Sequence, residues 1–239
     1  MKKSPEEALT VSRYFAVSLL VLTVIPTFGQ IPKQWHQPPS QEELQFAGQL
    51  MRSLMQAPDF PTLKGWNISP GSPPEMQINA YERGKEIFLP VEMFRFLKDD
   101  PGALTFLIAH EAGHAKQEEI YGESCYTAKN MKMSKFDWVR TLGDVAGGAA
   151  TKGVDGAATA AANVQKQACE DNADAWGVRF MREAGLDAAS GIRLFNRLDA
   201  ISQNAGWQGL ATQFFSDHSI NPVRVAHITA LILQKQKPQ

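Results

Sequence analysis

The sequence predicts a mainly α-helical α+β fold with a small β-sheet, built as one domain that follows an N-terminal segment. Apolar residues recur with helical spacing between recognisable start and stop residues along most of the chain. Only the region around residues 76–89 alternates apolar and polar residues as strands do. A chain of 239 residues that is 44% hydrophobic can bury one substantial core, or at most two small ones.

Residues 1–29 have the pattern of an export signal. A nearly continuous apolar run, Tyr14–Ile25, follows Arg13 and two further basic residues. Its length suits the apolar region of a signal peptide, about 7–15 residues, better than a membrane span of about 20. Thr27 and Gly29 would precede a cut before Gln30. We therefore expect an exported protein, periplasmic or membrane-associated and facing outside the cytoplasm. The alternatives are an uncleaved anchor and a buried helix of the fold.

The next elements are a linker, a helix and a loop. Residues 30–39 contain three prolines and no periodicity, which indicates a linker. Ser40 then begins a helix, because Glu43 lies three residues on and completes a capping box. Prolines at 58 and 61 end this helix, and residues 58–74 are rich in proline and glycine, as loops are.

A short β element is predicted next. Met76–Ala80 alternates apolar and polar residues, and so does the stretch around Ile87 and Leu89. Residues 82–85 between them have the composition of a turn. The pattern therefore indicates a two-stranded hairpin or a short meander.

Two helices follow the β element. The first is short and spans Val91–Leu97. The second opens with Asp100 as its N-cap and Pro101 in its first turn, and it continues to about Glu119.

The C-terminal half is predicted to hold three more helices. Residues 143–163 are rich in glycine and alanine, and we expect the next helix to begin only after them, over Val164–Ala184, with Gly185 ending it. Another helix is expected over Ala188–Gln203, and the last begins at Pro222. Residues 40–239 then form the single folded domain.

Composition excludes several kinds of protein. The chain has 24 lysine and arginine residues against 25 acidic ones, a net charge of −1, and no basic cluster interleaved with aromatic residues. We therefore expect no nucleic-acid partner, and membrane contact only through the N-terminal segment. Two cysteines, Cys125 and Cys169, are too few for a cysteine-rich zinc site. They form either one disulfide or two buried thiols, and the sequence leaves both open.

The motif His110-Glu111-Ala112-Gly113-His114 carries the strongest chemical signal in the chain. On a helix, residues four apart lie on one face, so both imidazoles can bind one metal ion. Glu111, next to the first histidine, can then act on a water beside that metal. This arrangement of two ligands and a general base is typical of zinc peptidases.

A catalytic zinc needs a third protein ligand. The extended three-histidine pattern is absent, since position 120 is isoleucine. The remaining candidates are His36, His218 and Glu170. Glu170 lies on a predicted semi-buried helix, where an unpaired carboxylate is costly, and Asp174 lies one turn further on. We expect Glu170 to bind the metal and Asp174 to accept the free N–H of a ligand imidazole.

Three motifs together resemble the gluzincin metalloendopeptidase family that includes HtpX, the CAAX prenyl proteases and BepA. They are the motif at 110–114, the sequence Glu-Asp-Asn-Ala-Asp at 170–174, and the C-terminal segment from His218 to Arg224. Asn79-Ala80 matches an upstream strand of the family. The resemblance covers roughly residues 40–235. Ser219 departs from it, since the family has a proline there.

This resemblance implies a zincin-like domain with one Zn²⁺ per chain, held between two helices. By it the zinc ligands are His110, His114 and Glu170, and Glu111 is the general base that activates water. Asn79 and Ala80 would pair with the backbone of a protein or peptide substrate.

Two C-terminal residues have roles that stay open. By the resemblance, His218 and Arg224 border the active site, where His218 would donate to the oxyanion or block the zinc. The structural alternative is that His218 caps the last helix and Arg224 pairs with a carboxylate.

The expected function is zinc-dependent endopeptidase activity on misfolded or unassembled proteins outside the cytoplasm. The alternative is a chaperone or assembly factor with a latent zinc site. A purely structural metal is disfavoured, because structural zinc usually has four protein ligands and would leave Glu111 without a role.

Overall fold

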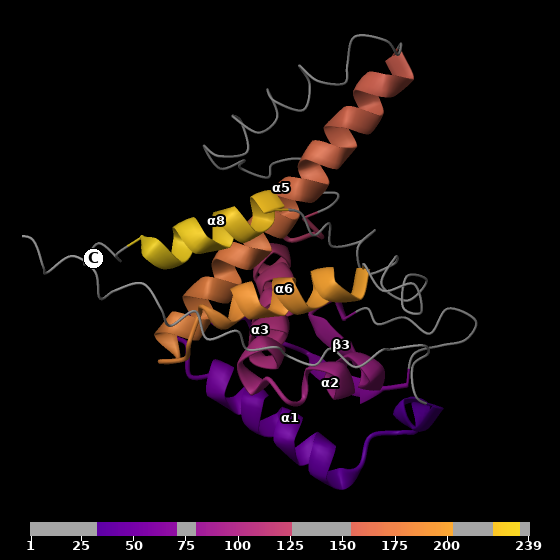
Figure 1. The fold of residues 1–239 in the computed structure, drawn as a ribbon. Coiled ribbons are helices and arrows are strands. Elements are labelled where there is room, and N and C mark those ends of the chain that lie inside the picture. The colour runs from indigo at the N-terminus through magenta and orange to yellow at the C-terminus, as the bar shows by residue number, and fades with distance from the viewer. Residues whose placement is uncertain (1–32, 71–79, 126–153, 203–221, 235–239) are drawn as a thin grey trace, which may run out of the picture.

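The computed structural model describes residues 33–70, 80–125, 154–202 and 222–234 (Figure 1). The described chain is mostly helical with one small sheet, as the sequence predicts. The export signal predicted over residues 1–29 lies outside it. In chain order the elements are the 3-10 helix η1 (Lys33–His36), α1 (Gln41–Leu54), β1 (Gly65–Ser69), β2 (Tyr81–Arg83), β3 (Glu86–Pro90), α2 (Val91–Leu97), α3 (Pro101–Tyr121), α5 (Val154–Glu183), α6 (Ser190–Ser202) and α8 (Pro222–Leu233).

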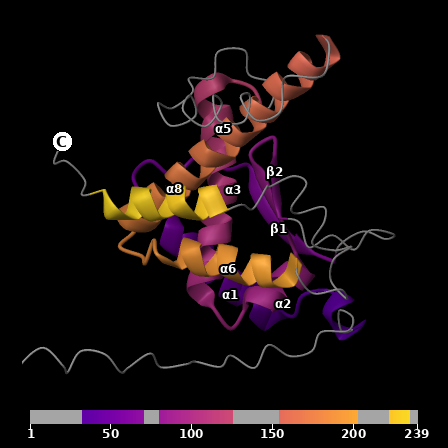
Figure 2. The ribbon, with the colours of Figure 1, turned by 45° about the horizontal axis from the view of Figure 1, so that its top comes forward.

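Helix α3 lies at the centre of the fold. It begins as predicted, with the Asp100 carboxylate accepting from the N–H of Ala103 at 3.0 Å and Pro101 in the first turn. It ends at Gly122, whose positive φ of 76° favours glycine. Helices α1, α5 and α6 and strands β2 and β3 all contact α3 (Figures 1 and 2). Its middle turns are therefore buried, although they carry the histidines and a glutamate.

The sheet has three strands, with β3 in the middle, β1 parallel to it and β2 antiparallel. The sequence prediction missed β1, because we expected loop over this region. Only Ile68 of this strand is buried, so it lacks the apolar alternation that marks a strand, and its pairing comes from β3. The predicted turn at 82–85 is shorter than expected: its first half belongs to β2, and Gly84 and Lys85 make the turn with positive φ.

Helix α5 begins at Val154, ten residues before the predicted start. The glycine and alanine content of this region suggested a low-complexity segment, but alanine has the highest helix propensity, and the alanines continue the helix towards the N-terminus. The rest of that segment, residues 143–153, lies outside the described residues. Figure 1 shows the first turns of α5 extending away from the other described helices.

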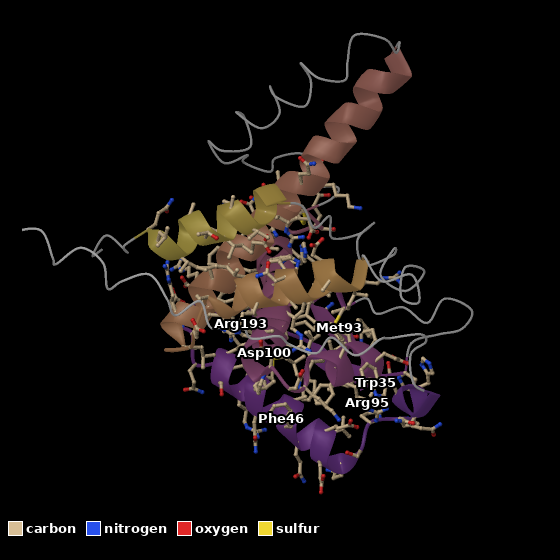
Figure 3. All side chains as sticks on the ribbon, viewed as in Figure 1. Trp35, Phe46, Met93, Arg95, Asp100 and Arg193 are labelled. Carbon is tan, nitrogen blue, oxygen red and sulfur yellow. A yellow bond between two sulfur atoms is a disulfide. The ribbon has the colours of Figure 1, made fainter. Side chains whose placement is uncertain are left out.

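The segment directly before α1 is bound to α2 through Arg95. Residues 33–38, expected as part of a linker, provide four backbone carbonyls to the guanidinium of Arg95, which also pairs with Glu43. Figure 3 shows Arg95 near Trp35 of this segment. The Arg95 hydrogen bond lowers the pKa of Glu43 to about 2. Glu43 is also half of the capping box that Ser40 was predicted to form, and both of its hydrogen bonds are present. Arg95 therefore links α1, α2 and the segment that precedes them.

One contiguous apolar core lies between α3 and the elements around it, and its largest buried side chains include Phe94, Phe106, Phe180 and Phe195. Among the described helices, none combines the length and the apolar character of a membrane span.

Candidate metal centre

Helices α3 and α5 bring three buried donors together. His110 and His114 lie one turn apart on α3, and Glu170 faces them from α5; each is at most 4% exposed. The two Nε2 atoms are 3.2 Å apart, and each lies 3.4 Å from a different carboxylate oxygen of Glu170. Donors at 2.0–2.1 Å from a tetrahedral zinc ion lie roughly 3.3 Å from one another. The spacing of the three donors therefore fits this ion.

Small residues allow the two helices to approach closely beside these donors. A Cβ atom on Gly113 would lie 2.5 Å from the carbonyl oxygen of Ala173, and one on Gly177 would lie 3.3 Å from the backbone nitrogen of His110. Gly113, the residue before His114, therefore allows the backbone of α5 to pack closely against α3 beside the donors.

Gly113→Ala is expected to destabilise the protein by about 1–3 kcal/mol, because the new methyl group must push α5 away from α3. Metal affinity should fall with it, since Glu170 moves with α5. Thermal unfolding and zinc titration measure the two effects.

Gly48→Ala in α1 is the matched control for this change. It adds the same methyl group to a helix interior, but there the methyl meets the flexible end of Arg52 at 3.3 Å and the ring of Trp66 at 3.7 Å, which is ordinary van der Waals contact. This variant should be neutral or stabilised, since alanine favours a helix over glycine by roughly 1 kcal/mol. Equal changes in stability for Gly113→Ala and Gly48→Ala would show that the contact between α3 and α5 at Gly113 does not limit the size of this residue.

Two further charged residues, Asp174 and Arg224, hold the ring of His110 in place. The Nδ1 of His110 lies 2.8 Å from Oδ1 of Asp174, and Arg224 of α8 donates to both oxygens of the same carboxylate at 2.6 and 2.7 Å. Arg224 also lies 3.2 Å from Glu170, and its guanidinium stacks on the ring of Phe195. Arg224 thus pairs with a carboxylate, as the structural alternative for this residue expected, and the pair lies beside the donor group.

Burial and charge act in opposite directions on this group. Burial raises the pKa of Asp174, but the charge and hydrogen bonds of Arg224 outweigh it and lower the pKa to about 2. Burial lowers the pKa of His110, yet its hydrogen bonds with Asp174 and Glu170 raise the pKa to about 10. For His114, burial dominates and the pKa falls. A histidine binds metal as a neutral imidazole, so a proton must leave His110 as a metal binds.

Glu111 is completely buried in α3 next to these donors. Burial raises the pKa of Glu82 on β2, and the charges of Glu118 and Glu111 add to this effect, since β2 packs on α3. Glu118, seven residues further along the same face of α3, forms a side-chain hydrogen bond with Glu82. Three carboxyl groups therefore lie between β2 and α3, and sequence reasoning did not single out Glu82 or Glu118.

The replacement Glu82→Gln is expected to stabilise the protein at pH 8 and to have little effect at pH 5. Burial raises the pKa of Glu82 from 4.5 to about 7, so between these values the folded state binds more protons than the unfolded state. Its contribution to stability is therefore present below pH 4.5 and is lost as the pH rises through 7. Because Glu82 is partly exposed, we expect a gain of about 1 kcal/mol at pH 8. Thermal unfolding at both pH values measures it, and a difference independent of pH would contradict the assignment.

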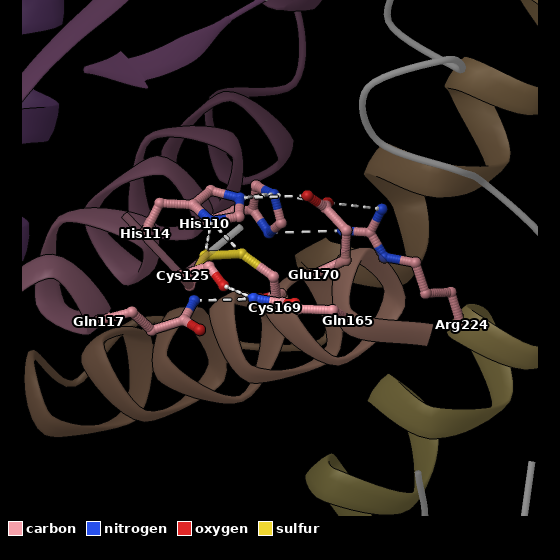
Figure 4. Close-up of a disulfide and its surroundings, with 8 residues drawn as sticks. All are labelled: His110, His114, Gln117, Cys125, Gln165, Cys169, Glu170 and Arg224. Carbon is pink, nitrogen blue, oxygen red and sulfur yellow. Dashed lines mark hydrogen bonds and ion pairs between the residues drawn. A yellow bond between two sulfur atoms is a disulfide. The ribbon is translucent and has the colours of Figure 1, made fainter. Parts of the chain in front are cut away.

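The two cysteines form a disulfide, Cys125–Cys169, which the sequence left open (Figure 4). Its sulfur atoms lie 3.8 and 3.6 Å from Nδ1 of His114. Sequence reasoning missed this contact, and the only signal for it was that Cys169 directly precedes Glu170.

The other predicted site residues lie elsewhere or outside the described chain. His36, a candidate third ligand, lies on η1 with its Nδ1 2.8 Å from Glu92, and it is not part of the donor group. Ala80 is buried just before β2. Asn79 and His218 are outside the described residues.

Comparison with known proteins bears on this site. Residues 41–232 match the model of Peptidase family M48. The match spans well over half of the chain and includes both helices that carry the donors. No curated protein matches the chain.

Proposed function

The chain belongs to peptidase family M48, a family of zinc-dependent metallopeptidases, and from this we propose that it is a zinc-dependent endopeptidase with Glu111 as its general base. The observation that carries the proposal is the group of His110, His114 and Glu170, whose donor distances fit a tetrahedral zinc ion and whose helix also holds Glu111. Three protein donors leave a fourth position open, which distinguishes a catalytic zinc from a structural one.

Each residue of the site then has a chemical role. A zinc ion held by His110, His114 and Glu170 would act as a Lewis acid, which would polarise the scissile carbonyl and lower the pKa of water. Glu111 accepts the proton of the attacking water and returns it to the leaving amine. Asp174 accepts from Nδ1 of His110, which leaves Nε2 to face the ion, and Arg224 keeps Asp174 ionised and in place.

Strand β2 is a suitable place for the substrate. It lies at the edge of the described sheet and packs on α3, the helix that carries Glu111. An extended peptide can add to such an edge through its backbone, which gives affinity with little dependence on side chains. We propose that the segment of Asn79 and Ala80 takes part in this pairing and that unfolded proteins are the substrates.

We further propose that these substrates are misfolded or unassembled proteins outside the cytoplasm. The export pattern of residues 1–29 supports this location, and so does the disulfide, since disulfides persist in oxidising compartments.

Cleavage of casein tests the proposed activity. The full chain should cut casein at internal positions and leave a stably folded protein intact. Removal of metal with a chelator should stop cleavage, and about one zinc ion per chain should restore it. Cleavage that continued after metal analysis showed the protein to be zinc-free would refute the proposal.

A further inference from the structure

The two imidazoles of the donor group are supported in different ways. His110 has the carboxylate of Asp174 2.8 Å from its Nδ1 atom, which is the usual support for a metal-binding histidine. At the same position of His114 lie the two sulfur atoms of the disulfide, at 3.8 and 3.6 Å (Figure 4). The disulfide thus occupies, beside the second ring, the place that a carboxylate occupies beside the first.

The disulfide also connects the two elements that carry the donors. Cys169 lies on α5 directly before Glu170, and Cys125 lies just beyond the end of α3. Hydrogen bonds between the same elements flank the bridge. Gln117 of α3 donates to the carbonyl of Cys169, and Gln165 of α5 donates to the carbonyl of Cys125, both at 3.0 Å.

The disulfide and the neighbouring ring of His114 are almost completely buried. Cys125 is 2% exposed, Cys169 is completely buried and His114 is 4% exposed. Two bonded sulfur atoms are about 2.05 Å apart, whereas two unbonded ones need a separation well over 3 Å. In a close-packed interior, opening of this bond must therefore displace a neighbour, and the ring of His114 is in contact with both sulfur atoms.

We propose that the disulfide Cys125–Cys169 is a positioning group of His114, so that the metal affinity of the site depends on the redox state of the two cysteines. The inference rests on the proposed zinc site. Reduction by a dithiol breaks the sulfur–sulfur bond, transfers two electrons and two protons to form two thiols, and leaves the dithiol as its own disulfide. Without this bond, α5 is no longer linked to the segment that follows α3, and the separated sulfur atoms displace the ring of His114. Thiol–disulfide exchange with an oxidised dithiol takes the two electrons and two protons back and re-forms the bond, which restores the link and the position of the ring, so the site binds metal tightly only in the oxidised protein.

The test compares metal binding by the oxidised protein, by the protein reduced with a dithiol and then gel-filtered without oxygen, and by the double variant Cys125→Ala/Cys169→Ala. Zinc affinity is measured by competition with a chelator, and the visible spectrum of bound Co²⁺ reports the geometry of the ligands. We expect affinity to fall roughly 10- to 100-fold in the reduced protein and in the double variant, with an altered cobalt spectrum in both. Re-oxidation of the reduced protein should restore both properties.

Gln165→Ala is the matched control. It removes a hydrogen bond to the backbone of Cys125 but leaves the disulfide and its contact with His114, so its affinity and cobalt spectrum should equal those of the oxidised protein. If the double variant does not fold, reduction and re-oxidation of the unaltered protein decide the question.

Two results would overturn the inference alone. One is equal affinity and the same cobalt spectrum in the oxidised and reduced protein. The other is a sulfur-to-cobalt charge-transfer band in the reduced protein, which would make the cysteines ligands rather than positioning groups. A failure of the oxidised protein to bind zinc would instead refute the proposed function, and the inference with it.

Discussion

Glu111→Gln is expected to abolish cleavage of casein and to leave about one zinc ion per chain. Glutamine has nearly the same shape as glutamate, so the packing of a completely buried residue should survive the change. It cannot accept a proton from water, however, and general-base catalysis typically contributes 10²–10⁴-fold to the rate, so a loss of roughly this size or more is expected. The donors of the metal group do not include Glu111, and the variant should therefore retain its zinc.

Glu119→Gln provides the control on the same helix. Glu119 is exposed and pairs with Lys116 on the surface of α3, so this variant should cleave casein as the unaltered protein does. Retained cleavage in Glu111→Gln would refute the mechanism. An inactive Glu111→Gln variant that still rescued a strain lacking the protein would instead favour a chaperone or assembly factor with a latent zinc site.

The helices could be predicted from the sequence because their ends are encoded locally. Asp100 and Pro101 mark the start of α3, and Gly185 marks the end of α5 with a positive φ of 71°. Strand β1 could not be predicted, since it is defined by its pairing with β3 and buries only Ile68. Elements that depend on a partner distant in sequence leave little trace in their own residues.

The same distinction applies to the site. His110, Glu111 and His114 are related by helical spacing alone, and a sequence pattern therefore identifies them. Glu170 required a further inference from the semi-buried character of its helix and from a family resemblance, and the structure places it 3.4 Å from both histidines. The contact of the disulfide with His114 depends on how α3 and α5 pack, which no local pattern specifies.

Arg224→Met is expected to destabilise the metal-free protein by about 3–5 kcal/mol at neutral pH, because it removes one of the cations that balance the buried carboxylates of Asp174 and Glu170 and leaves protonated His110 between two negative charges. The loss should depend on pH. In the unaltered protein the pKa of Asp174 is lowered from 3.8 to about 2, so this carboxylate contributes stability above pH 3.8 that is lost as the pH falls through 2. The variant lacks this contribution, and the difference between the two proteins should shrink below about pH 4.

Arg193→Met is the control that separates burial from charge pairing. Arg193 also bridges two carboxylates, Asp100 and Asp187, but its side chain is 47% exposed, whereas that of Arg224 is 1% exposed. Exposed pairs contribute about 0–1 kcal/mol, so chemical denaturation should show a far smaller loss for this variant. Equal losses of stability in the two variants would mean that the burial of the charges around His110 does not determine how much Arg224 stabilises the protein. Zinc should also reduce the loss in Arg224→Met but not in Arg193→Met, since only the first leaves uncompensated negative charge beside the metal donors.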